Sequence, residues 1–223
     1  MFPLGTVLFP GGVLPLHVFE PRYRQLVQDC LAADTPEFGV VLIERGSEVG
    51  GGDVRSPVGV VARMVEVAEL GDGRYAVVTV GTRRVRVLTW LDDDPYPRAE
   101  AEEWPDAGPE EDFGERLEEV VTTLRRVLAL AAELGEAVAP ATVELSDDPL
   151  LANYHAAALA PLGPADQYEL LVAAGPEERV RLLSTMLADV EEVARLRLAV
   201  GGHPGGFDGG GEADGSGVDD EQP

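Results

Sequence analysis

Three arginines in a β-like run, Arg83, Arg84 and Arg86, are the residues whose type and spacing come closest to a binding site. Two aromatic residues, Tyr75 and Trp90, flank them in the sequence. Guanidinium groups beside aromatic rings can bind phosphate groups and stack on unpaired bases, so the cluster predicts contacts with an anion, a small molecule or RNA.

A second interpretation of the same arginines is structural. Glu66, Glu69 and the acidic segment 106–112 provide carboxylates with which the arginines can form ion pairs on a solvated sheet face. We favour this interpretation because arginine readily forms two-pronged hydrogen bonds with carboxylates.

The sequence predicts no catalytic, cofactor-binding or metal-binding residues. His17, His155 and His203 are far apart and match no metal-ligand spacing. Cys30 is the single cysteine and falls on the apolar stripe of a predicted helix, so we expect it to be a core residue. All 17 basic residues are arginines, which excludes a phosphate-binding loop lysine, a Ser–Lys dyad and a Schiff-base lysine.

Composition limits the class of protein further. The 223 residues are 45% hydrophobic, enough for one large or two small domains, and no apolar run approaches the ~20 residues that span a bilayer. The net charge is −24, and residues 91–223 carry −23 of it, which disfavours nucleic acid and anionic membranes as partners. A single cysteine and no signal-peptide pattern predict a reducing, cytoplasmic setting.

The N-terminal stretch MFPLGTVLFPGGVLPLHVFEPRYR predicts two short strands, a sharp turn and the start of a helix. Pro21 suits the first helical position because its φ is fixed and its missing N–H is not needed there. We expect Pro15, Glu20, Pro21, Arg22 and Tyr23 to form a structural motif in which the arginine pairs with the glutamate or caps neighbouring strand carbonyls.

Residues 1–105 predict a mainly β subdomain with one inserted helix, which a small closed or nearly closed barrel would satisfy. The helix is expected at 21–34 and a glycine-rich loop at 45–57. The strands are expected at 38–44, 58–70, 75–80, 83–91 and 98–104, with a bend at Gly81 and Thr82.

Residues 106–200 predict an all-α bundle. Apolar residues recur at helical spacing in 113–134, 150–159, 165–173 and 176–200, with Asp148 as the N-cap of the second helix and Gly135 ending the first. Residues 201–223 hold nine glycines and six acidic residues, so we expect this acidic tail to be disordered.

The segments PLGTVLFPG and LPLHVFEPRYR resemble the N-terminal, substrate-binding domain of Lon proteases. The similarity continues through the predicted strands of 58–104 and through SDDPLLANYHAAALAPLG, and covers about residues 2–198. It implies an α+β fold, namely a PUA-like barrel followed by a helical bundle. The PUA-type relatives bind RNA, and cereblon, with a related barrel, is a ligand-binding substrate receptor.

The resemblance implies a non-enzymatic module that binds unfolded or tagged polypeptides, with a Lon-type protease as a further candidate partner. The proteolytic part of a Lon protease uses a Ser–Lys pair and its ATPase uses a Walker motif, and this sequence contains neither. The alternative is a small-molecule or RNA-binding PUA-like module that uses Arg83, Arg84, Arg86 and Trp90.

Overall fold

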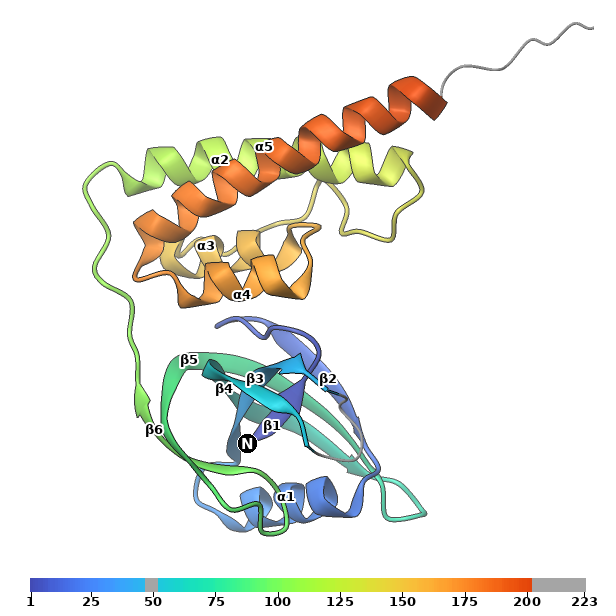
Figure 1. Ribbon diagram of the computed structural model, residues 1–223, viewed down its shortest axis with the longest axis vertical. Helices are drawn as coiled ribbons and strands as arrows, with labels where there is room; N and C mark the ends of the chain where they lie inside the picture. Colours follow the sequence, from blue (N-terminus) through green and yellow to red (C-terminus); the bar gives the residue numbers. More distant parts are fainter. Residues whose placement is uncertain (47–51, 202–223) are drawn as a thin grey trace, which may run out of the picture.

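The computed structural model describes residues 1–46 and 52–201, which form a curved β-sheet and a group of helices (Figure 1). The predicted acidic tail therefore lies outside the described residues, apart from Gly201. The strands are β1 (Phe2–Leu4), β2 (Val13–Val18), β3 (Glu37–Arg45), β4 (Val54–Glu69), β5 (Tyr75–Leu91) and β6 (Arg98–Glu103). The helices are α1 (Pro21–Ala32), α2 (Phe113–Glu133), α3 (Pro149–Leu159), α4 (Pro164–Val172) and α5 (Pro176–Gly201).

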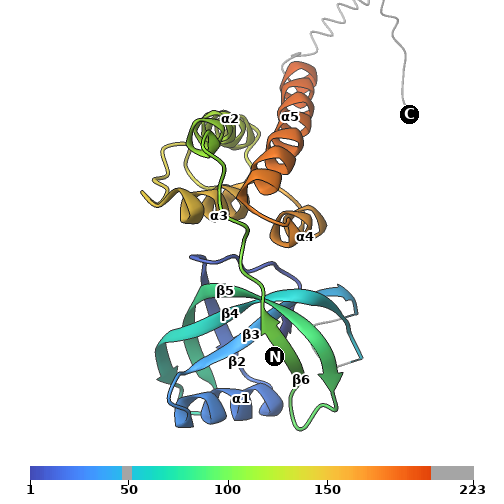
Figure 2. The ribbon, with the colours of Figure 1, turned by 90° about the vertical axis from the view of Figure 1, so that its left-hand side faces the viewer.

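The sheet is mixed and its strands follow the order β1-β3-β4-β5-β2. β1 runs parallel to β3, the other pairs are antiparallel, and β6 pairs with the far end of β5. Within the described residues, β1 and β2 are the two ends of this path, and each is paired on one side only. The sheet curls around its core, with α1 across one end (Figure 2). The predicted α+β class and the nearly closed barrel are confirmed.

The 83–91 and 75–80 segments form one strand, so the prediction of two strands with a bend at Gly81 and Thr82 was wrong. Thr82 is an extra residue in β5, because Val61 pairs with Arg83 and Ala62 pairs with Gly81. The Thr82 hydroxyl donates a hydrogen bond to the Val61 carbonyl, 3.0 Å away. A β-bulge therefore absorbs the bend without ending the strand.

The predicted 45–57 loop was too long, because β4 already begins at Val54 and pairs with the end of β3. Arg55 favours this extension. Its guanidinium bonds Asp93 in the β5–β6 loop through both terminal nitrogens, at 3.0 and 2.8 Å. This ion pair holds the start of β4 against the β5–β6 loop, although the glycines and polar residues of the 45–57 segment predict a loop there.

The four later helices lie in two layers at the end of the sheet opposite α1, with α3 and α4 next to the strands and α2 and α5 beyond them (Figure 1). Their ends follow the sequence signals. The Asp148 side chain accepts a hydrogen bond from the Leu150 N–H, and Gly135 has a φ of +80° after α2. One apolar core cluster includes residues of the strands, of α1 and of the four later helices.

Candidate functional site

The arginine cluster predicted from the sequence does not form an open patch. Arg83 lies 2.6 Å from a Glu37 oxygen and 2.8 Å from Glu103. Arg86 lies 2.7 Å from Glu102. These partners are on β3 and β6, so they differ from the Glu66 and Glu69 that the sequence suggested.

Trp90 lies apart from the cluster. Its ring is covered by the Arg55 guanidinium, whose central carbon is 5.1 Å from the ring centroid. The three arginines are therefore each paired with a carboxylate of this chain, and Trp90 contacts Arg55.

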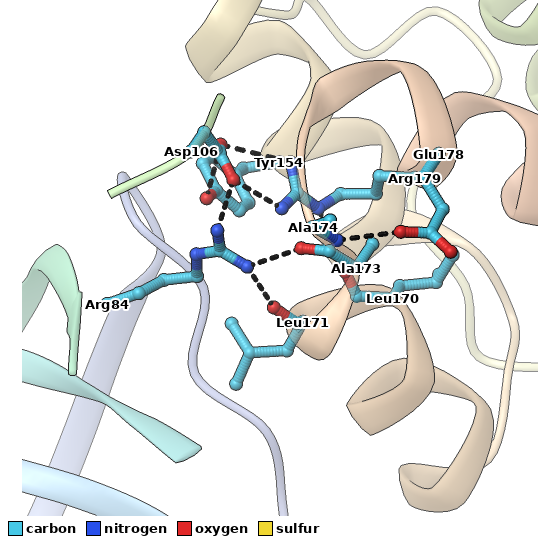
Figure 3. Close-up of polar contacts among 9 residues, drawn as sticks. All are labelled: Arg84, Asp106, Tyr154, Leu170, Leu171, Ala173, Ala174, Glu178 and Arg179. Atoms are coloured by element: carbon cyan, nitrogen blue, oxygen red, sulfur yellow. Dashed lines mark hydrogen bonds and ion pairs between the residues drawn. The ribbon is translucent and has the colours of Figure 1, made fainter. Parts of the chain in front are cut away.

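Arg84 points away from solvent and into the junction between the sheet and the helices (Figure 3). It is 3% exposed, and one of its terminal nitrogens donates to the carbonyls of Leu171 and Ala173, each 2.7 Å away. The other lies 2.5 Å from Asp106. Burial is the largest influence on the pKa of Arg84 and lowers it from its ordinary value.

Asp106 joins this arginine to a second one. Arg179, which is fully buried, lies 2.9 Å from the same carboxylate and donates to the Leu170 carbonyl. The Tyr154 hydroxyl donates to Asp106 at 2.6 Å. Two guanidinium groups thus bond the carbonyls at the C-terminal end of α4, where the helix dipole favours cations. The network connects β5, the 104–112 linker, α3, α4 and α5.

The N-terminal motif occupies the other end of the sheet. Pro21 is the first residue of α1, and the Arg22 Nε lies 3.0 Å from a Glu20 oxygen. The Arg22 guanidinium covers the Tyr23 ring at 4.5 Å, and that ring stacks on Phe2 with centroids 4.0 Å apart. Burial raises the pKa of Tyr23 to about 12. The motif holds the start of α1 against β1.

Pro15 lies in the middle of β2, on the strand that ends the sheet. β2 pairs with β5 along Val13–Val18, and within the described residues no strand pairs with its other edge. A proline in a strand is typical of an edge, because it cannot donate a ladder hydrogen bond. That signal was present in the sequence, although sequence reasoning did not use it to locate the edge.

Three surface grooves adjoin β2. The first, here the edge groove, has a volume of about 220 Å³ and lies between β1 and β2; it is lined by Phe2, Leu4, Leu16, Val18 and Tyr23 among others. The second, the outer groove, has a volume of about 360 Å³ and extends from Pro15 and His17 over β5 to Glu66 and Ala68 on β4. Their linings are mainly aliphatic and aromatic.

The third groove, the junction groove, has a volume of about 450 Å³ and lies between the 6–14 segment and the helices. Val143, His155 and Leu159 line it on the helical side, and Glu144 lies at the same wall. Its lining includes Val13 and Leu14, so it meets the start of β2, whereas the edge groove includes Phe19 and Glu20 at the other end.

Exposed apolar residues mark both ends of the strand. Val13 is 66% exposed and Phe19 is 50% exposed. An unpaired strand edge with apolar grooves beside it can accept an extended polypeptide, because the main chain supplies hydrogen bonds and the grooves take alternate side chains.

The described residues contain no group of three or more His, Cys, Asp or Glu side chains that could hold a metal ion. Cys30 is buried, and its thiol donates to the Glu37 carbonyl at 3.3 Å. Burial raises the pKa of that thiol, which makes it a poor nucleophile. Over residues 1–46 and 52–201, each helix is too short or too polar to cross a bilayer.

Comparison with protein families matches residues 1–189 to the ATP-dependent protease La (LON) substrate-binding domain. Over 203 residues the chain is 32% identical to Lon protease 2 of Sorangium cellulosum, covering 87% of this chain and 25% of that protein. It is 31% identical over 197 residues to the Lon protease of Anaeromyxobacter dehalogenans, covering 87% and 21%. The chain thus spans about a quarter or less of the length of these relatives.

Two solved structures share the fold. A Lon N-terminal domain protein from Xanthomonas campestris is 29% identical, with a TM-score of 0.57, and the match covers 84% of this chain and 95% of that one. The N-terminal domain of a Mycobacterium avium complex Lon protease is 20% identical, with a TM-score of 0.60, covering 84% and 97%.

Proposed function

The chain belongs to the family of the Lon protease substrate-binding domain, and from that premise we propose that it is a non-enzymatic module that binds unfolded or tagged polypeptides along β2. The observation that carries the proposal is the edge of Val13–Val18 with which no other described strand pairs, together with the apolar edge groove that lies along it. A polypeptide added to that edge would extend the sheet by one strand.

The same premise supports a Lon-type protease as a partner to which bound polypeptides are delivered. The absence of lysine supports a non-enzymatic role, because it excludes the Ser–Lys pair on which Lon proteolysis depends. The single cysteine supports a cytoplasmic setting. The alternative of RNA or anion binding through β5 loses support, because Arg83, Arg84 and Arg86 are paired within the chain.

The experiment is a binding assay with a defined unfolded protein, one that is reduced and blocked with iodoacetamide so that it cannot refold. We expect the full chain to bind this protein and to ignore its native form. Val13→Glu and Phe19→Glu place a charge on the proposed surface without disturbing the core, and each should weaken binding at least about tenfold, equivalent to about 1.4 kcal/mol.

Leu88→Glu and Val193→Glu are the matched controls. These residues are 59% and 55% exposed, comparable with Val13 and Phe19, but line none of the three grooves. Both controls should bind as the wild type does. Equal losses in all four variants, or binding of the native form as well, would contradict the proposal.

A further inference from the structure

The last turns of α5 expose a row of apolar side chains. Val193 is 55% exposed, Leu196 60% and Val200 79%. These turns project beyond the other helices (Figure 2). We infer that the row is an interface with a second copy of the chain, in which two α5 helices pair in parallel as a short coiled coil. This inference goes beyond the proposed function and does not depend on it.

The sequence of α5 has the spacing of a coiled coil. Steps of four and three residues alternate along one stripe of the helix, which consists of Leu182, Met186, Asp189, Val193, Leu196 and Val200. Positions with this spacing are the a and d positions that face the partner helix in a coiled coil. Val193 and Val200 are at a and Leu196 is at d, and this combination of a β-branched a residue with a leucine at d favours two parallel helices.

The stripe is distinct from the face of α5 that packs on its own chain. That buried face lies about a third of a turn around the helix, since successive residues are about 100° apart. It includes Val180, Leu183, Leu187 and Ala194. At the other end of the stripe, Leu182 and Met186 are partly buried against the core of the chain. The free part of the stripe therefore begins at Asp189.

Asp189 sets the length of the interface. Two parallel helices in contact at this d position would bring two aspartates together, so the helices must diverge there. The seam is then limited to 193–200, which is about 12 Å of helix. Three side chains per copy can bury on the order of 300–400 Å², less than the roughly 800 Å² per partner of a stable interface. The geometry therefore predicts a weak dimer that forms at high protein concentration.

The charges beside the seam favour the parallel arrangement. In a parallel pair, Glu192 occupies a g position and faces the e position five residues further along the second copy, which is Arg197. Glu192 is exposed, and the Arg197 side chain remains 55% exposed beside Glu136 of its own chain. An antiparallel pair with Val193 opposite Leu196 would instead place Asp189 opposite Val200.

The net charge of the chain does not concentrate at the seam. Residues 189–200 contain three acidic residues and two arginines, a net charge of −1, and the next acidic residue after the seam is Asp208. Repulsion between charges that are further apart is largely screened beyond about 8–10 Å at ordinary salt. The acidic character of the chain thus weakens the pair without preventing it.

Disulfide trapping measures the proximity of the two helices. The full chain would carry Leu196→Cys on the seam or Ala188→Cys, which is an exposed position of α5 outside the stripe, as the matched control. Cys30 is buried, so the introduced cysteine is the reactive one. In a glutathione redox buffer, we expect Leu196→Cys to form at least about ten times as much disulfide-linked dimer as Ala188→Cys.

The same assay tests orientation and charge. When Val193→Cys and Val200→Cys are mixed, homodisulfides should exceed mixed disulfides, because a parallel pair places each position opposite itself. Glu192→Arg should reduce trapping of Leu196→Cys about threefold or more. Adding Arg197→Glu should restore it, because the exchanged charges again attract each other across the seam.

Sedimentation equilibrium checks the chain without an added cysteine. The wild type and Leu88→Glu should be monomers at micromolar concentration and partly dimers near 1 mM, whereas Val193→Glu should remain monomeric. Equal trapping of Leu196→Cys and Ala188→Cys, an excess of mixed disulfides, or a wild type that stays monomeric up to about 1 mM would overturn the inference. The proposed function is tested separately, because Val193→Glu should still bind the unfolded protein.

Discussion

Replacing Arg84 by methionine should weaken the connection between the sheet and the helices. The methionine keeps an apolar stem near Trp104, over which the Arg84 guanidinium now lies at 4.5 Å. It removes the two hydrogen bonds to the C-terminal carbonyls of α4 and one of the two arginines that face Asp106.

The size of the effect follows from burial. Removing one partner of a buried ion pair typically costs about 3–5 kcal/mol, and a hydrogen bond from a charged donor contributes about 1.5–3 kcal/mol. Asp106 keeps Arg179 and Tyr154, so we expect a loss of about 3–5 kcal/mol in the free energy of unfolding. That is a large part of the roughly 5–15 kcal/mol that stabilises a typical domain.

Urea denaturation followed by two signals tests this prediction. Trp90 and Trp104 lie on the sheet side of the junction, so tryptophan fluorescence reports the sheet, while circular dichroism at about 222 nm reports mainly the helices. The two transitions should coincide in the wild type. In Arg84→Met both midpoints should fall, and the helical signal should be lost first.

Arg86→Met is the matched control. Arg86 also lies over Trp104, at 5.4 Å, but it is exposed and pairs with the exposed Glu102, so its loss should cost less than about 0.5 kcal/mol. If Arg84→Met is no more destabilising than Arg86→Met, the buried network does not hold the junction and the reasoning is refuted.

Three other changes probe the fold. Gly81→Ala would place a Cβ 2.2 Å from the carbonyl oxygen of Phe9, in the connection between β1 and β2, and should cost at least about 1–3 kcal/mol in thermal melts. A Cβ at Gly114 would have no neighbour within 4 Å, so Gly114→Ala should be neutral or stabilising, and equal melting temperatures for the two variants would contradict this. Asp148→Ala should cost about 1 kcal/mol by removing the α3 cap and Asp148→Asn only a few tenths, so identical losses in denaturant titrations would argue against capping. A hydrogen bond from Arg83 lowers the pKa of Glu37 below its ordinary 4.5. The pair therefore stabilises the fold above that pH, and the stabilisation is lost as the pH falls through the lowered value. From neutral pH to about pH 3 the free energy of unfolding should decline less steeply in Glu37→Gln than in the wild type, and an unchanged slope would count against the pair.

Local signals in the sequence account for much of the fold. The proline after Asp148 and the glycine after α2 placed two helix ends, because caps depend on a few adjacent residues. The sequence around Gly81 and Thr82 predicted two strands where there is one. The extra residue is a β-bulge, which can be recognised only from the pairing of β5 with β4.

The burial of individual arginines on β5 could not be predicted from the sequence. Arg84 and Arg86 are two residues apart and share the same local pattern, yet one is buried and the other exposed. The difference comes from the end of α4, which lies over Arg84 and is 87 residues away in the sequence. The grooves beside β2 could not be predicted from the sequence either, because they are formed by segments that only the folded chain brings together. Pro15 was the one local signal, since a proline within a strand indicates an edge strand.

Hydrogen–deuterium exchange of the full chain, with and without the permanently unfolded protein, tests the binding surface most directly. The account predicts that those amides of Val13–Val18 that point away from β5 exchange more slowly in the complex, because the added strand accepts hydrogen bonds from them. Unchanged exchange in β2 together with protection on the helical side, for example between α2 and α5, would contradict it.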